Sequence, residues 1–234
     1  MRKEAAQEWR ITMKKVDLHV HSTYSDGTNT PKELIKLAEN EGLSAIALTD
    51  HDTLDGIPDA LDAAKNSSVE LIPGVELSTN FNNTEVHIVG LFLDHNNKQI
   101  NDYLIYQRQS RIDRNIQMCQ KFCDIGINIT YDKMCELYPD AVITRAHFAD
   151  YLVKNKYTGD RNEAFDRYLS PGKPCFVNRH KVDPEEAVAV IHKAHGAAIL
   201  AHPVLYHLGK DQMNALLEHV CSAGIDGIEA IYST

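Results

Sequence analysis

The sequence has 234 residues and a formal net charge of −9, and 43% of its residues are hydrophobic. A chain of this length suits one large domain, or one domain with an insertion, that buries its own core. The acidic charge argues against a broad basic surface for long nucleic acid, but leaves a small phosphorylated partner open. Since we find neither a signal peptide nor an apolar run long enough to span a membrane, we expect a cytoplasmic protein.

Cysteine and histidine usage narrows the classes of site. The five cysteines are an odd number without a CxxC pair, which argues against a disulfide framework and against a structural zinc cluster. We therefore expect buried, reduced thiols. Twelve histidines are the unusual feature of the composition, and a cluster would give several of them one purpose.

The first predicted strand follows residues 1–13, which we interpret as a disordered tail or expression remnant. Its side chains alternate between a polar face with Asp17, His19 and His21 and an apolar face with Val16, Leu18 and Val20. Imidazole and carboxylate are usual ligands of zinc, iron and manganese, so the polar face predicts a metal site. The apolar face is expected to pack. The alternative is that these histidines only make hydrogen bonds on a solvent-exposed strand face. This alternative explains two histidines at strand spacing followed by Ser-Asp-Gly less well than a metal site does.

Helices and strands then alternate through residue 95. A helix is expected over 31–41, because Thr30 can cap it, Pro31 occupies its first position and Gly42 follows as a stop. Continuously apolar strands are expected at 44–48 and 71–76, a weaker helix at 57–65, and a strand at 85–93.

Residues 96–175 depart from this alternation and predict an all-helical insertion. A long amphipathic helix is expected over 99–124, and shorter helices over 131–138, 144–155 and 162–169. The stripe expected to be buried on the long helix contains Ile100, Leu104, Ile112, Ile116, Cys119 and Phe122 or Cys123. Alternation resumes in 176–234, with helices expected at 183–196 and 210–223 and strands at 197–201 and 227–231.

Strand and helix alternation predicts a parallel α/β sheet, open or closed into a barrel, in which the carboxyl ends of the strands meet at one mouth. Candidate ligands lie at or near those ends, or in the loop after them, on five predicted strands: His19, His21, Asp26, His51, Glu76, His87 and His202. They exceed what one tetrahedral zinc uses, so we expect two or three metal ions with Glu76 as a bridging carboxylate. Asp17 and Asp52 are candidates for orienting the imidazoles, with simple capping or surface roles as the alternative.

Five motifs together resemble the polymerase and histidinol phosphatase (PHP) family. They are His19-Val20-His21 with Ser25-Asp26-Gly27, Thr49-Asp50-His51-Asp52, Pro73-Gly74-Val75-Glu76, His87-Ile88-Val89-Gly90 and Leu200-Ala201-His202-Pro203. The resemblance implies a distorted (β/α)7-type barrel that binds up to three metal ions and hydrolyses phosphoesters. The segments 142–148 and 168–173 are similar to insertion motifs of the branch that contains nucleoside 3′,5′-bisphosphate phosphatases and 5′-to-3′ exoribonucleases.

The resemblance also implies how the ligands divide among the metals. His19 and His21 would hold the first ion, Asp26 and His51 the second, and His87 and His202 the third, with Glu76 shared. Manganese is the first expectation, with iron or zinc as alternatives, since these ligands suit all three. Residues 14–95 and 176–234 would form the first and second parts of the barrel. Family members carry a further Asp-x-His motif and a seventh strand after the last motif found here, so we expect the second part to be truncated. If the chain is whole, its catalytic competence is in question.

The substrate-binding prediction rests on the insertion, which we expect to fold over the barrel mouth as a lid. Arg145 and His147 lie near the start of the predicted helix 144–155, and a helix N-terminus favours anions. We expect Arg145 to bind a second phosphate, His147 to contact phosphate or leaving-group oxygen, and Lys173 to supply a further cation. The alternatives are a solvated arginine, a packing histidine and an exposed loop lysine.

The expected activity is hydrolysis of a phosphate ester of a nucleotide, either a nucleoside 3′,5′-bisphosphate or the 5′ end of short RNA, by metal-activated water. A histidinol-phosphate phosphatase is the first alternative, although the helical insertion argues against it. Amidohydrolases share His-x-His on a barrel strand, but without Ser-Asp-Gly and Thr-Asp-His-Asp at these positions. A non-catalytic metal-binding or regulatory PHP module is the alternative from another class. The sequence leaves the metal, the choice between mononucleotide and RNA, and the oligomeric state open.

Overall fold

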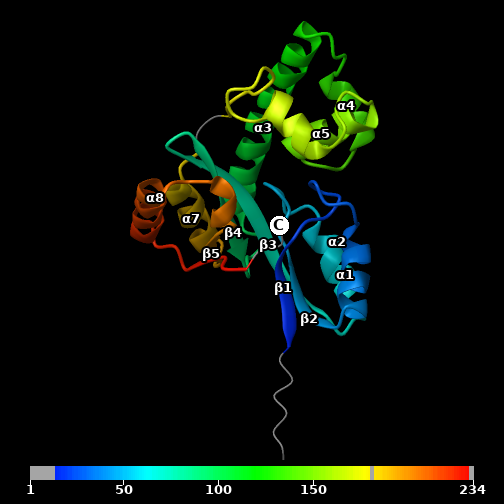
Figure 1. Ribbon diagram of the computed structural model, residues 1–234. Coiled ribbons are helices and arrows are strands. Elements are labelled where there is room, and N and C mark those ends of the chain that lie inside the picture. Colours follow the sequence, from blue (N-terminus) through cyan, green and yellow to red (C-terminus); the bar gives the residue numbers. More distant parts are fainter. Residues whose placement is uncertain (1–13, 180–181, 232–234) are drawn as a thin grey trace, which may run out of the picture.

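A computed structural model describes residues 14–179 and 182–231, so the predicted tail at 1–13 lies outside the described residues (Figure 1). The described strands form one curled six-stranded sheet in the order β1-β2-β3-β4-β5-β6. Their bounds are Lys15–Val20 (β1), Leu43–Leu48 (β2), Glu70–Phe81 (β3), Thr84–Leu91 (β4), Ala197–Leu200 (β5) and Gly227–Ile228 (β6). The predicted α/β class is confirmed.

The helices agree closely with the predicted ones. They are Pro31–Asn40 (α1), Ile57–Ala64 (α2), Lys98–Asp124 (α3), Tyr131–Leu137 (α4), Arg145–Lys154 (α5), Arg161–Ala164 (α6), Pro184–Lys193 (α7) and Lys210–Ser222 (α8). A π-helix, Phe165–Leu169 (η1), continues α6, and a 3₁₀-helix, Pro203–Tyr206 (η2), follows β5. Thr30 and Glu33 form the expected capping box of α1. Within the described residues, no helix has both the length and the apolar character that a membrane span requires.

The fully parallel sheet was a wrong expectation, because β4 runs antiparallel to both β3 and β5. The reason is a two-residue hairpin at Asn82 and Asn83, whose φ angles are 48° and 67°. Two consecutive left-handed residues are typical of the turn that joins antiparallel strands directly. The reversal matters for the site: it brings the amino-terminal half of β4, with His87, to the end of the sheet where the other strands have their carboxyl ends.

The two faces of the sheet have different roles. Figure 1 shows α1 and α2 beside β1 and β2, and α7 and α8 beside β4 and β5. Apolar side chains such as Leu48, Leu77 and Ile88 join these helices in the main hydrophobic core. On the opposite face, Glu76 and His87 lie on the same strands as the apolar residues Ile72 and Val89, which form a smaller core. Alternation along each strand thus separates helix-packing residues from a face that ends in the site.

Helix α3 connects two cores. Its first turns place Ile100 and Leu104 in the core of the sheet, whereas Met118 and Phe122 belong to a separate core with α4, α5 and η1. Between them, the buried face is polar and consists of Gln107, Arg111, Arg114 and Asn115. The predicted stripe was therefore wrong in its middle, where Ile112 is only partly buried and Ile116 is 51% exposed.

Two further expectations about burial were wrong. Val16 and Leu18 are 51% and 38% exposed, because β1 is an edge strand of the described sheet. All five cysteines are free, as expected, but Cys123 and Cys221 are exposed because they lie on the outer faces of α3 and α8.

Candidate metal centre

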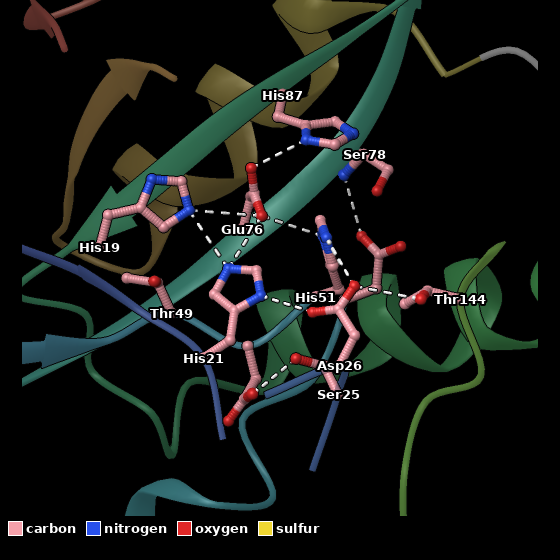
Figure 2. Close-up of polar contacts among 12 residues, drawn as sticks. His19, His21, Ser25, Asp26, Thr49, His51, Glu76, Ser78, His87 and Thr144 are labelled. Carbon is pink, nitrogen blue, oxygen red and sulfur yellow. Dashed lines mark hydrogen bonds and ion pairs between the residues drawn. The ribbon is translucent and has the colours of Figure 1, made fainter. Parts of the chain in front are cut away.

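Glu76, on β3, lies at the centre of a group of imidazoles, and its side chain is 1% exposed. Figure 2 shows His19, His21, His51 and His87 arranged around this carboxylate. Its Oε1 lies 2.8 Å from both His87 Nδ1 and His202 Nε2. Its Oε2 lies 3.4 Å from His19 Nε2, 3.0 Å from His21 Nε2 and 3.0 Å from His51 Nδ1. The structure therefore brings all five predicted histidines to one carboxylate.

Asp26 supplies a second carboxylate at this site. Its Oδ1 lies 2.8 Å from His21 Nδ1, and its Oδ2 accepts a hydrogen bond from the Thr144 hydroxyl and lies 3.6 Å from His51 Nε2. Gly27 permits the turn that presents Asp26, because a Cβ at this position would lie 2.1 Å from the carbonyl oxygen of His21. The Ser-Asp-Gly motif thus positions the Asp26 carboxylate, a predicted ligand, through a close approach that other residues cannot make.

The nitrogen atoms of the site suit a cation. The Nε2 atoms of His19 and His21 lie 3.2 Å apart, where only one of them can carry a proton directed at the other. His51 Nδ1 is buried and makes no hydrogen bond among the described residues, although it lies 3.0 Å from Glu76 Oε2. Convergent imidazole lone pairs beside a carboxylate are the donor set that transition-metal ions prefer.

Among residues 14–179 and 182–231, three groups of potential ligand atoms are compact enough to hold an ion: His19, His21 and Glu76; His21, Asp26 and His51; and His51, Glu76 and His87. Within each group, the ligand atoms lie within 4.8 Å of one another. His21, His51 and Glu76 each belong to two groups. The arrangement fits a cluster of ions with shared ligands better than separate sites.

Electrostatics divide the imidazoles into two kinds. Burial lowers the pKa of His51 to about 3, although Glu76 and Asp26 act in the opposite direction. Burial also opposes protonation of His87, but Glu76 and Glu85 raise its pKa to about 9. Burial likewise opposes ionisation of Glu76, and the charge of His87, with side-chain hydrogen bonds from His19 and His202, nevertheless holds its pKa well below the usual range. The carboxylate is therefore charged, and His51 presents a neutral ring, as a metal ligand must.

Of the two alternatives left open for Asp17 and Asp52, the geometry does not favour the orienting role. Asp17 is exposed and accepts a hydrogen bond from the His19 backbone N–H, at 3.2 Å. Asp52 is fully buried but pairs with Arg111 and Arg179, because its backbone is left-handed (φ 51°) and its side chain turns toward α3. Glu229 is in the position expected of an orienting residue: its carboxylate lies 3.2 Å from His19 Nδ1 and accepts a hydrogen bond from the His202 backbone N–H.

A cavity of about 590 Å³ opens at the centre. Its lining combines predicted ligands such as His21 and Glu76 with Arg145, Arg161 and Phe165 of the insertion, so the insertion does reach the barrel mouth. Arg145 makes an ion pair with Glu85 and lies over the Phe176 ring. Arg161 and Phe165 were not predicted. Both residues follow Asp160, the N-cap residue of α6. An N-cap residue predicts where a helix begins, but it does not predict which side chains of that helix line a cavity.

His147 and Lys173 lie outside the described lining of this cavity. The Nδ1 atom of His147 accepts a hydrogen bond from the Thr144 backbone N–H and completes a capping box at the start of α5. The ring also packs against Tyr138, with the ring centres 4.3 Å apart. His147 thus fixes Thr144, which in turn binds Asp26, whereas Lys173 is exposed on the turn after η1.

Asp50 was part of a predicted motif but had no assigned role. It is 2% exposed and accepts hydrogen bonds from the Ser22 backbone N–H and from the hydroxyls of Ser22 and Ser25. These bonds hold the loop between His21 and Asp26. The three acceptor contacts offset the cost of burying a carboxylate.

A model of the PHP domain matches residues 17–197 of the chain. A 5′-3′ exoribonuclease of Haemophilus influenzae is 41% identical over 92% of this chain and 78% of its own length. A 3′,5′-nucleoside bisphosphate phosphatase of Chromobacterium violaceum is 36% identical over 93% of this chain and 76% of its own length.

Two solved structures have the same fold. A protein from Chromobacterium violaceum, described as an amidohydrolase with bound sulfate and no metal, matches with a TM-score of 0.86 at 36% identity. The match covers 92% of this chain and 76% of that one. A candidate metal-dependent phosphoesterase from Bifidobacterium adolescentis matches with a TM-score of 0.81 at 27% identity, over 92% of this chain and 77% of that one.

Proposed function

This chain belongs to the PHP domain family, and we propose that it is a metal-dependent phosphoesterase acting on nucleoside 3′,5′-bisphosphates or on the 5′ end of short RNA. The observation that carries the proposal is the group of five imidazoles around Glu76, at a cavity that also contains Arg145. The exoribonuclease and bisphosphate phosphatase relatives support this substrate class. A cavity of about 590 Å³ is in the size range of small-molecule sites. The net charge of −9 favours a small phosphorylated partner over long nucleic acid.

We propose that two or three divalent ions bind here, with manganese as the first choice and iron or zinc as alternatives. His19, His21, Asp26, His51, Glu76, His87 and His202 would hold them. When bound, such ions would lower the pKa of a water molecule and neutralise charge on the phosphoryl group during hydrolysis.

The protein side chains supply position and charge. Glu76 holds the imidazoles around one point, and Glu229 fixes the orientation of the His19 ring by occupying its second nitrogen. Arg145 faces the cavity and is placed to bind phosphate oxygen, because its guanidinium can donate two hydrogen bonds to an oxyanion. We propose that His147 acts through Thr144 and Asp26 rather than on the substrate. Because Lys173 lies outside the lining of the cavity, it would contact only a substrate that extends beyond the cavity.

The test is phosphate release by the purified protein with manganese. We expect turnover of a nucleoside 3′,5′-bisphosphate, loss of turnover with a chelator, and recovery when manganese is restored. His51→Ala removes an imidazole and leaves the apolar residues of β2 untouched, so it should abolish turnover while the protein stays folded. Undiminished turnover in His51→Ala would remove this residue from the site.

The same assay separates the alternatives. Release from histidinol phosphate alone would favour a histidinol-phosphate phosphatase. Hydrolysis of N-acylated amino acids without phosphate release would favour an amidohydrolase, the description given to one matched structure. Metal binding without turnover of any phosphoester would favour a non-catalytic module and would contradict the proposal.

A further inference from the structure

The hydroxyl of Tyr206 lies within the hydrogen-bond ladder between β4 and β5. These strands are antiparallel, and the last pair of their register is Ile88 and Leu200. One residue further, the Ala201 N–H donates to the His87 carbonyl oxygen at 3.0 Å, so these two residues form the next pair. Residues of a hydrogen-bonded antiparallel pair normally exchange two N–H···O=C bonds. The second bond, from the His87 N–H to the Ala201 carbonyl, is the one that Tyr206 interrupts.

Tyr206 binds both groups that this second bond would join. The His87 N–H donates to the Tyr206 hydroxyl oxygen at 3.0 Å, and the hydroxyl donates to the Ala201 carbonyl oxygen at 2.7 Å. The His87 carbonyl oxygen is farther away, at 3.4 Å, so we assign the one hydroxyl proton to Ala201. These three groups are here called the tyrosine bridge. Because a direct N–H···O=C bond is only about 2.9 Å long, the bridge holds this N–H and this carbonyl farther apart than a regular ladder would.

The tyrosine bridge adjoins two candidate metal ligands that come from different strands. His87 belongs to β4, and His202 follows Ala201 directly after the end of β5. Both rings reach the same oxygen, because Glu76 Oε1 lies 2.8 Å from His87 Nδ1 and 2.8 Å from His202 Nε2. The backbone separation at the tyrosine bridge therefore sets the separation of two imidazoles that converge on one point.

The backbone of His202 needs such support. Its φ and ψ angles are 24° and 55°, outside the regions that a residue with a side chain favours, and such a conformation persists only where its surroundings hold it. The His202 N–H donates to Glu229 at 2.7 Å, and its carbonyl oxygen accepts from the Leu205 N–H at 2.9 Å. The Tyr206 ring lies against the His202 ring, with the ring centres 5.7 Å apart. Tyr206 thus contacts the ring of His202 and, through its hydroxyl, the residue before it.

The local sequence explains how Tyr206 reaches back to the strand. Pro203 begins the 3₁₀-helix η2, which ends at Tyr206. A 3₁₀ turn needs only about three residues, so it returns the chain to the end of β5 at once. The Tyr206 ring packs against the main hydrophobic core and also lines the cavity of the metal centre. Packing of the ring therefore fixes the position of the hydroxyl.

We infer that Tyr206 is a positioning residue of the metal centre, whose hydroxyl holds β4 and β5 at the separation that lets His87 and His202 bind the same group of ions. This inference rests on the proposed function, which places divalent ions among these imidazoles. Tyr206 acts through the two backbones and does not itself bind the metal. Outer residues that orient ligands contribute to metal affinity in the same way.

The first test measures manganese affinity by competition with a chelator. Tyr206→Phe keeps the ring and its packing and removes only the hydroxyl, so manganese should bind about 10- to 100-fold more weakly. Turnover by this variant should return toward the wild-type value when manganese is raised to saturation. Tyr151→Phe is the matched control, because it removes a hydroxyl that donates to the Asn128 carbonyl oxygen in the insertion. This control should keep the wild-type affinity.

The second test measures amide hydrogen exchange in chelator-treated protein. In Tyr206→Phe the phenyl ring still lies between the two strands, so the His87 N–H cannot bond directly to the Ala201 carbonyl and loses its acceptor. Its exchange should become at least about tenfold faster, whereas the Val89 amide, further along β4, should exchange as in the wild type. Tyr151→Phe should leave both amides unchanged.

The outcomes separate this inference from a structural role and from the proposed function. A hydroxyl with a merely structural role would lower the unfolding midpoint without changing manganese affinity. Equal manganese affinity in Tyr206→Phe and the wild type, or unchanged exchange at His87, would overturn the inference. Weaker binding by Tyr206→Phe would support it even if no phosphoester were hydrolysed. A wild-type protein that binds no metal would contradict the inference and the proposed function together.

Discussion

The metal centre shares two strands with a smaller polar pocket, here called the arginine pocket, but the two have opposite chemistry. The arginine pocket is lined by Ser78 of β3, Glu85 of β4, Arg111 and Arg114 of α3, Arg145 of α5, and Arg179. In the metal centre, five imidazoles converge on the buried carboxylate of Glu76. In the arginine pocket, four guanidinium groups face two carboxylates. Neither cluster is balanced internally, so one favours cations and the other favours anions. Because side chains two residues apart on a strand share a face, β3 and β4 place two sites of opposite chemistry at a fixed spacing.

The largest expected effect breaks the metal centre alone. Glu76→Gln keeps the shape of the side chain but removes the charge shared by the imidazoles, so turnover should fall by at least about 1,000-fold. Metal analysis should show fewer ions per chain. The arginine pocket should be unaffected, since Glu76 is not part of its lining. Full metal content with undiminished turnover would contradict the role of Glu76.

The second prediction breaks the internal pairing of the arginine pocket. Asp52→Asn leaves Arg111 and Arg179, 6% and 13% exposed, without their carboxylate. Removing one partner from a buried ion pair costs about 3–5 kcal/mol of unfolding free energy. Urea unfolding at pH 7 measures this loss. Asp55→Asn is the control, because its carboxylate pairs with Arg108 and is 55% exposed.

The pH dependence of the Asp52→Asn loss has a definite sign. Burial opposes ionisation of Asp52, but Arg111 and Arg179 lower its pKa far below the ordinary value. A depressed carboxyl pKa gives stability that is complete above the unfolded value of about 4 and is lost as the pH falls further. The difference between wild type and variant should therefore shrink from pH 7 to pH 3. A difference that grows in acid would show that Asp52 is not stabilised as a carboxylate.

The third prediction sharpens the description of the metal centre. Glu229→Gln keeps the hydrogen bond from the His202 backbone possible but removes the charge beside His19 Nδ1. Loss of such an outer carboxylate typically weakens metal binding by about 10- to 100-fold. Titration with a competing chelator measures the change, with Glu218→Gln on the exposed side of α8 as control. Equal metal affinity in the two variants would contradict the orienting role of Glu229.

The difference between the clusters also explains what could be predicted from the sequence. His19, His51, Glu76 and His202 follow or lie in short apolar strands, so their positions relative to the sheet were readable from local pattern. Glu229 was not identified as a residue of the site, since a single glutamate in a short apolar strand resembles a solvent-exposed residue of an edge strand. The direction of β4 was missed, although Asn82 and Asn83 between two apolar runs were a hairpin signal.

Arg111 and Arg114 were not predictable by the same reasoning, whereas Arg145 was predicted near the start of a helix. Arg111 and Arg114 lie on α3, where charged residues normally mark the solvent face and isoleucines mark the core. Here the helix crosses from one core to the other, and its buried face passes the arginine pocket between them. On this part of α3 the arginines are therefore buried and the isoleucines are partly or largely exposed, opposite to the pattern expected of an amphipathic helix. The reason is tertiary: Asp52 and Ser78 accept hydrogen bonds from the buried Arg111.

The smallest expected effect tests this reversed pattern directly. Ile116 is apolar but 51% exposed, so Ile116→Gln should change the free energy of unfolding by less than about 0.5 kcal/mol. Met118, two residues along α3, is fully buried in the insertion core, and Met118→Ala should cost about 2–5 kcal/mol. Urea unfolding of both variants measures the contrast. Similar losses in the two would place Ile116 in the core and return Arg111 and Arg114 to the solvent face. Such a result would remove the structural basis of the arginine pocket while leaving the metal centre intact.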